Sequence, residues 1–126
     1  MQGRTRVLAV DDDRLIRLNL SLLLGREGLE VDTAATCREA RTLLDRRPYG
    51  VVVTDLDLPD ASGLEVVKWA RENCPDTKII LISGSSTALE GLQALDEDAA
   101  KSVVLKPFRF DELLTLVRDA LTKSDA

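Results

Sequence analysis

The chain has 126 residues, of which 44% are hydrophobic and 31% are charged, a balance that fits one globular domain and excludes a disordered or fibrous protein. Its 17 basic and 22 acidic residues give a formal net charge of -5, and the basic residues are scattered, so we expect no direct binding of nucleic acid. No apolar run approaches the ~20 residues of a spanning helix, and the N-terminus lacks the features of a signal peptide. We therefore expect no membrane association and a cytoplasmic location.

The chain contains no histidine and two cysteines, Cys37 and Cys74. Without histidine, a histidine-dependent catalytic triad is excluded, and the two cysteines lack the spacing of zinc ligands. Any metal ion would have to be held by oxygen ligands. Both cysteines fall on apolar faces of predicted helices, so we expect them to pack in the core.

Segments with strand and helix patterns alternate along the chain. Runs rich in Val and Ile predict five strands, and apolar residues with helical spacing between them predict five helices. Strict alternation predicts an α/β fold, a doubly wound parallel sheet with helices on both faces. In chain order the predicted elements are a strand at 7–10, a helix at 15–24, a strand at 31–35, a helix at 40–44, a strand at 51–53, a helix at 64–70, a strand at 79–82, a helix at 88–95, a strand at 103–105 and a helix at 113–121.

Three of these helices are predicted to begin at capping boxes, in which a hydroxyl side chain precedes a glutamate by three residues and satisfies free amides at the helix start. The last residues, 122–126, are polar, and we expect them to form a frayed tail outside a core of about residues 6–121. The predicted capping pairs are Thr36 with Glu39, Ser62 with Glu65, and Thr87 with Glu90.

Polar side chains follow four of the five predicted strands. In doubly wound sheets, ligands bind at the carboxyl ends of the strands, so these side chains are the candidates for chemistry. They are Asp11, Asp12 and Asp13 after the first strand, Asp55 after the third, Ser83 after the fourth and Lys106 after the fifth.

Asp55 directly follows a buried apolar strand, where a carboxylate repels other carboxylates nearby unless a cation or a proton intervenes. Taken alone, the three consecutive aspartates could be a solvated helix start, Ser83 a turn hydroxyl and Lys106 a surface lysine. Together these groups offer oxygen ligands for Mg²⁺, and a hydroxyl and an ammonium group to offset the charge of a phosphoryl group in transfer. Asp55 could be the nucleophile that accepts this group as an acyl phosphate.

These residues lie in the segments VLAVDDD, VVVTDLDLPDASGLEVV, IILISGS and VVLKPF, which together resemble the receiver domain of two-component response regulators. The resemblance implies a single receiver domain over residues 1–126, with the flavodoxin-like fold of the CheY-like family and the strand order 2-1-3-4-5. It implies a domain that takes a phosphoryl group from a sensor histidine kinase or a histidine phosphotransfer protein. The phosphorylated domain would control an output protein or an effector domain outside this chain, without turnover of an external substrate.

The resemblance also implies roles for particular residues. Pro107 resembles the proline that follows the family's lysine and is usually preceded by a cis peptide bond. The implied ligands of Mg²⁺ are Asp11, Asp12, Asp55 and the backbone carbonyl of Asp57, and the implied catalytic residues are Asp55 as the phosphoacceptor, Ser83 and Lys106.

The resemblance also implies which residues control the lifetime of the acyl phosphate and which surface transmits the conformational change. Asp57 and Ser85 match positions that flank the path of the hydrolytic water, so we expect them to set the lifetime of the acyl phosphate. Val103 replaces an aromatic residue that rotates in the family, and its β-branched side chain cannot swing a ring. We expect output through the face of the fourth helix, fifth strand and fifth helix, by a shift of the loop 83–89 and the helix 88–95.

Two alternative functions compete with a phosphorylated receiver. The sequence Asp55-Leu56-Asp57 also resembles the DxD signature of haloacid-dehalogenase-like phosphatases, but the acidic pair precedes it here, and the chain has no room for a cap domain. A degenerate receiver that only binds partners would have lost the acceptor or the lysine, and this chain has both. Incubation with acetyl phosphate and Mg²⁺ distinguishes the three functions.

Overall fold

The computed structural model describes residues 5–84 and 103–122. The predicted helix at 88–95, its capping pair Thr87 and Glu90, and Ser85 lie outside these ranges. Within them the chain forms five strands and four helices. These are β1 (Arg6–Val10), α1 (Arg14–Gly25), β2 (Glu30–Ala34), α2 (Cys37–Arg46), β3 (Val51–Asp55), α3 (Leu64–Asn73), β4 (Lys78–Ser83), β5 (Val103–Leu105) and α6 (Phe110–Thr122).

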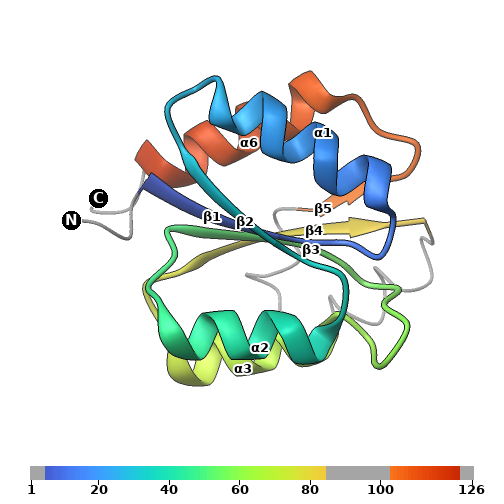
Figure 1. Cartoon of the computed structure of the whole chain (residues 1–126), viewed down its shortest axis with the longest axis vertical. Coiled ribbons are helices and arrows are strands. Elements are labelled where there is room, and N and C mark those ends of the chain that lie inside the picture. The colour runs from blue at the N-terminus through green and yellow to red at the C-terminus, as the bar shows by residue number, and fades with distance from the viewer. Residues whose placement is uncertain (1–4, 85–102, 123–126) are drawn as a thin grey trace.

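The five strands form one parallel sheet in the order β2-β1-β3-β4-β5, which confirms the predicted order. Helices α1 and α6 cover one face of the sheet, and α2 and α3 cover the other (Figure 1). The fold is therefore the doubly wound α/β arrangement. Because helices cover both faces, the central strands are buried on both sides and consist of continuous Val and Ile runs.

Each face of the sheet carries its own apolar cluster. Side chains alternate along a strand, so that Leu8 and Val10 of β1 face α2 and α3, while Val7 of the same strand faces α1 and α6. Each fully buried side chain of this size stabilises the fold by about 1.5–3 kcal/mol. Cys37 is buried in the cluster under α2 and α3, as predicted, and Cys74 is half-buried against the same cluster.

Two of the predicted capping boxes fall on described residues, and the second forms only in part. At α2, Thr36 Oγ accepts a hydrogen bond from the amide of Glu39 at 3.1 Å, as predicted. At α3, Gly63 rather than Ser62 occupies the N-cap position, but Ser62 Oγ accepts a hydrogen bond from the amide of Leu64 at 3.2 Å. Ser62 also pairs with Asp57 in an isolated antiparallel bridge, which keeps Ser62 in the loop, so the helix begins two residues later at Leu64.

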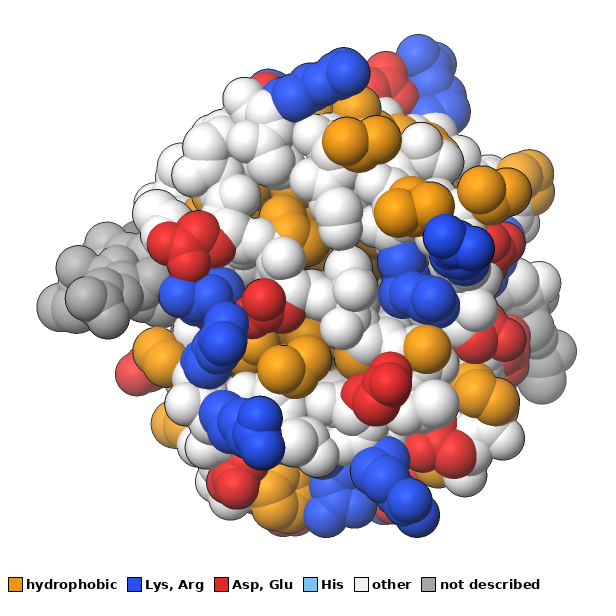
Figure 2. All heavy atoms as spheres, viewed as in Figure 1, with side chains coloured by type: hydrophobic (Ala, Val, Ile, Leu, Met, Phe, Trp, Pro, Cys, Tyr) orange, Lys and Arg blue, Asp and Glu red, His pale blue; other side chains and the backbone are white. Residues whose placement is uncertain are grey.

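Figure 2 shows Lys and Arg side chains interspersed with Asp and Glu over the face in view, rather than gathered into one basic stripe. Among residues 5–84 and 103–122, no helix combines the length and the apolar character needed to cross a membrane.

Gly63 is the point at which the start of α3 touches the end of β3. A Cβ atom at this position would lie 2.1 Å from the backbone oxygen of Asp55 and 2.9 Å from the Cα atom of Leu56. The Gly63 amide donates a hydrogen bond to the carbonyl of Leu56 at 2.9 Å. Only glycine allows this close approach of two backbones, which fixes the loop after β3.

We expect Gly63→Ala to lower the free energy of unfolding by about 1–3 kcal/mol, because the methyl group collides with backbone atoms that cannot rotate away. Urea unfolding of the two proteins measures the change. Gly25→Ala is the matched control, since a Cβ atom at Gly25 meets nothing within 4 Å. This control should be neutral or stabilise the fold by about 0.5–1 kcal/mol, because alanine is the better helix residue. Equal stability of Gly63→Ala and the wild type would contradict the packing argument.

Candidate functional site

Three acidic side chains meet at the carboxyl edge of the sheet. Carboxylate oxygens of Asp11, Asp12 and Asp55 all lie within 4.8 Å of one another. Strands β1 and β3 are neighbours, with Val10 paired to Thr54, so Asp11, which follows β1, and Asp55, the last residue of β3, reach the same edge. Asp11 and Asp55 are each only 1% exposed, whereas Asp12 is open to solvent.

The three consecutive aspartates have different positions. Asp13 is the N-cap of α1, and its Oδ1 accepts a hydrogen bond from the amide of Leu15 at 2.9 Å. The simple alternative of a solvated helix start therefore describes Asp13 alone. Asp11 is held from both sides, because its Oδ1 accepts from the Asp13 amide at 2.8 Å and its carbonyl accepts from the Arg17 guanidinium at 2.7 Å.

Lys106 brings one ammonium group to these carboxylates from the end of β5. Its Nζ lies 2.5 Å from Asp55 Oδ2 and 3.9 Å from Asp11 Oδ2. Burial by itself lowers the pKa of Lys106, but the hydrogen bond to Asp55 and the charge of Asp11 outweigh it, so the pKa is raised. The ammonium group therefore stays protonated at neutral pH. The peptide bond between Lys106 and Pro107 is cis, as the resemblance implied.

The remaining predicted residues lie around Asp55. The amide of Asp57 donates a hydrogen bond to Asp55 Oδ1 at 2.9 Å, and the Asp57 side chain is exposed. Ser83 ends β4 with no exposed surface, next to Ile82, which pairs in register with Asp55. Its carbonyl accepts from the Lys106 amide at 2.8 Å, which ties β4 to β5 at this edge.

The surroundings of Asp11 disfavour the negative charge of its carboxylate. Its Oδ2 is buried and has no hydrogen-bond partner among the described residues. Desolvation by burial, opposed by the Asp13 amide and reinforced by the charge of Asp55, raises the pKa of Asp11 to about 6. The buried Oδ2 of Asp11 and the carboxylates of Asp12 and Asp55 together form a fitting set of ligands for a hard cation such as Mg²⁺, which prefers oxygen ligands and keeps several waters.

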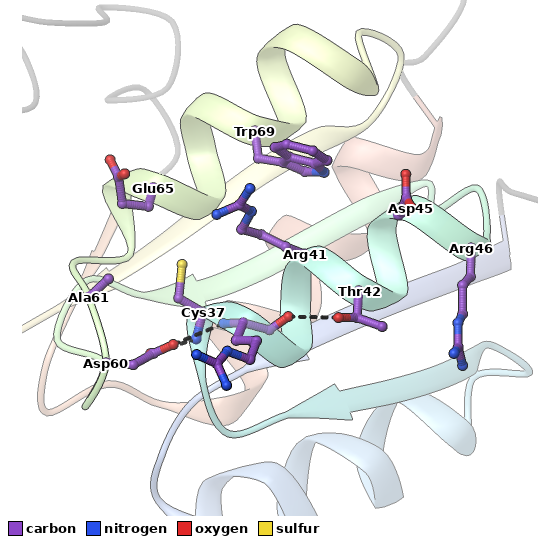
Figure 3. A pocket seen from close by; sticks show the side chains of 10 residues that line it. Cys37, Arg41, Thr42, Asp45, Arg46, Asp60, Ala61, Glu65 and Trp69 are labelled. Carbon is purple, nitrogen blue, oxygen red and sulfur yellow. Dashed lines mark hydrogen bonds between the residues drawn. The ribbon is translucent and has the colours of Figure 1, made fainter.

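A separate pocket lies between α2 and α3, away from the three carboxylates. It has a volume of about 640 Å³ and is lined by Arg41, Asp60 and Trp69 among others (Figure 3). None of the six predicted site residues lines this pocket. Asp60 lies in the loop after β3 and was not predicted to have a role, because its contacts are with residues far away in the sequence.

Comparison with known proteins places the chain among response regulators. The family model of the response regulator receiver domain matches residues 7–118. The response regulator protein PilR of Pseudomonas aeruginosa is 36% identical over 119 residues, covering 94% of this chain and 26% of PilR. The transcriptional regulatory protein KdpE of Mycobacterium tuberculosis is 35% identical over 126 residues, covering 97% of this chain and 53% of KdpE. The chain thus spans about a quarter to a half of the length of these relatives.

Solved structures agree over nearly the whole chain. The beryllofluoride-activated NtrC4 receiver domain dimer has a TM-score of 0.84 at 32% identity and covers 99% of this chain and 100% of that one. The response regulator TrrA of Thermotoga maritima, in complex with Mg(2+)-BeF, has a TM-score of 0.80 at 38% identity and covers 92% of this chain and 98% of that one. Family, fold and site geometry lead to one conclusion. This chain belongs to the response regulator receiver domain family of two-component signal transduction.

Proposed function

We propose that this chain is one phosphorylated receiver domain over residues 1–126, which accepts a phosphoryl group on Asp55 and so controls an output partner. The donor would be a sensor histidine kinase or a histidine phosphotransfer protein. The observation that carries this proposal is the Lys106 ammonium group 2.5 Å from Asp55 Oδ2, with Asp11 and Asp12 beside them. The output partner would be a separate protein or an effector domain outside this chain.

Mg²⁺ would be held by the carboxylates of Asp11, Asp12 and Asp55 and by the backbone carbonyl of Asp57. The Oδ2 atom of Asp11 supports this ligand set, because it is buried, makes no hydrogen bond among the described residues and has only the ammonium group of Lys106, which is bonded to Asp55, nearby at 3.9 Å. When bound, the ion supplies positive charge that screens the incoming phosphoryl group from these carboxylates.

The protein groups around Asp55 suit a transfer to its carboxylate. A carboxylate oxygen of Asp55 attacks phosphorus, the bond from phosphorus to the donor histidine nitrogen breaks, and the histidine keeps the electron pair of that bond. Lys106 is placed to donate to the phosphoryl oxygens, and the Ser83 hydroxyl lies at the neighbouring strand end. The Asp57 amide holds the other oxygen of Asp55, so the carboxylate is oriented before the donor arrives.

Several expectations from the sequence remain predictions within this proposal. They are the absence of external-substrate turnover, the cytoplasmic location, and the control of the acyl phosphate lifetime by Asp57 and Ser85. Output through the surface that includes β5 and α6, without a rotating aromatic residue, also remains a prediction. Val103 is half-buried against the cluster under α2 and α3.

The outer side of α1 offers a docking surface for the donor protein. Leu15, Leu18 and Leu22 are 69%, 48% and 60% exposed, and their spacing places them on one helical face. Hydrophobic side chains gather on the surface over α1 (Figure 2). The stripe begins in the first turn of α1, three residues after Asp12, so a donor packed along it would extend toward the carboxylates. Exposed apolar patches of this kind mark interaction sites.

We expect Asp55→Asn to abolish labelling of the chain by acetyl phosphate with Mg²⁺, because the amide is not a competent nucleophile. Intact mass spectrometry measures the reaction as the addition of one phosphoryl group per chain. This group should be stable in acid and labile in base. Asp13→Asn is the matched control, since asparagine also caps α1 and Asp13 lies outside the carboxylate cluster. Undiminished labelling of Asp55→Asn would show that another residue is the acceptor.

We expect Asp11→Asn to stabilise the metal-free protein at pH 7 by on the order of 1–3 kcal/mol while weakening Mg²⁺ binding. Because burial raises the pKa of Asp11 to about 6 from 3.8, its contribution to stability is full below pH ~4 and is lost as the pH rises through about 6. The asparagine side chain does not ionise, so the variant keeps this contribution to stability as the pH rises. Urea unfolding from pH 4 to 8 without Mg²⁺ tests it, and identical pH profiles for variant and wild type would argue against a raised pKa.

We expect Leu18→Glu to slow phosphoryl transfer from a histidine kinase that phosphorylates the wild-type chain, by roughly tenfold. Labelling by acetyl phosphate should be unchanged, because the small donor needs no docking surface. Asn19→Glu adds the same charge at the next exposed position of α1 and serves as the control. The docking proposal fails if Leu18→Glu and Asn19→Glu have the same rates with the kinase.

A further inference from the structure

One side chain joins the loop after β3 to the start of α2. Asp60 Oδ1 accepts a hydrogen bond from the amide of Cys37 at 2.8 Å, and its Oδ2 accepts from the amide of Arg38 at 3.0 Å (Figure 3). Cys37 lies 23 residues before Asp60 in the sequence, so this contact is tertiary. Both carboxylate oxygens are used by the first turn of α2.

The contact is additional to the local cap of α2. Thr36 Oγ already accepts from the Glu39 amide, and the Glu39 carboxylate accepts from the Ala35 amide at 2.7 Å. Asp60 takes the two amides at the helix start that this local cap leaves free. These hydrogen bonds hold the pKa of Asp60 below its usual range, so the group at the positive end of the helix dipole is charged.

Helix α2 is a firm anchor for this contact. Cys37 is buried in the apolar cluster, together with the side chains on the inner face of α2. The Arg41 guanidinium lies over the Trp69 ring, with its Cζ atom 4.4 Å from the ring centroid. This contact packs α2 against α3. Asp60 borders the pocket between these helices, but its oxygens point to the amides of α2 and act as an anchor (Figure 3).

The loop between β3 and α3 is thus held at its base and at its tip. At the base, the Leu56 amide donates to the carbonyl of Ile82 in β4 at 3.0 Å, and the Gly63 amide donates back to Leu56. At the tip, the Asp60 carboxylate bonds to α2. The carbonyl of Asp57 lies between these two fixed points.

We propose that Asp60 is a positioning residue for metal-dependent phosphorylation, because its bonds to α2 hold the Asp57 carbonyl where it can bind Mg²⁺. The inference rests on the proposed function, in which that carbonyl is a ligand of the ion. Asp60 itself touches neither the metal site nor the phosphoryl group. Without the anchor, the described restraints on the loop would be the contacts at its base and the bridge between Asp57 and Ser62. The Asp57 carbonyl would then have more freedom to lose when the ion binds, and this cost would weaken the binding.

The test compares two variants that weaken the same helix start. Asp60→Ala removes the bonds between the loop and α2, while Thr36→Ala removes the local cap and leaves the loop untouched. Calorimetric titration of the full chain with MgCl₂ should show about tenfold weaker binding for Asp60→Ala and wild-type binding for Thr36→Ala. Asp60→Asn, which keeps one acceptor oxygen, should show a smaller loss. Amide exchange at residues 56–63 without Mg²⁺ should quicken in Asp60→Ala alone, with urea unfolding as the check on folding.

Unchanged Mg²⁺ affinity in Asp60→Ala would overturn the proposal. Equal weakening in Asp60→Ala and Thr36→Ala would also overturn it, because the effect would then come from the stability of α2. If Asp60→Ala does not fold, Asp60→Asn gives the same comparison. A wild-type chain that binds no Mg²⁺ would instead overturn the proposed function, so the two failures are separable.

Discussion

The repulsion between carboxylates at one buried edge is the constraint on which the site depends. Asp11 and Asp55 are almost completely buried, Asp12 lies beside them, and among the described residues Lys106 is the cation bonded to this cluster. One ammonium group cannot balance the charges of three neighbouring carboxylates, two of which are buried. The pKa of Asp11 is raised chiefly by burial, and the charges of Asp55 and Asp12 raise it further. The protein therefore gives up stability at this edge, and in the proposed function a bound divalent cation would offset that cost.

The sheet imposes this arrangement through its register. Because β1 and β3 are adjacent and parallel, the residues after Val10 and Thr54 end at the same level. Backbone contacts then remove the freedom to relax, since Gly63 lies directly against the Asp55 carbonyl and the Asp57 amide holds the Asp55 carboxylate. The carboxylates stay together because the surrounding core is rigid, which is how functional sites retain unfavourable electrostatics.

The sequence predicts the parts of the fold that depend on local signals. The Val and Ile runs locate the strands, and the polar residues near their carboxyl ends locate the candidate site, because parallel strands share one carboxyl edge. Helix bounds are less accurate, since apolar spacing marks only the buried face. The helix predicted at 40–44 runs from Cys37 to Arg46. Asp60 was missed because its partners are 23 and 22 residues away, and no local pattern marks such a contact.

The two sides of the site are held with unequal firmness. On the β3 side, Asp55 is fixed by the Asp57 amide, by Gly63 and by the loop anchored at Asp60. On the other side, Lys106 follows β5, a three-residue strand that pairs with β4 alone among the described strands. A phosphoryl group on Asp55 would break the direct contact with Lys106 and insert its oxygens between them. The more weakly held side must give way, so the displacement would pass into β5 and the start of α6, whereas the loop toward α2 would keep its place.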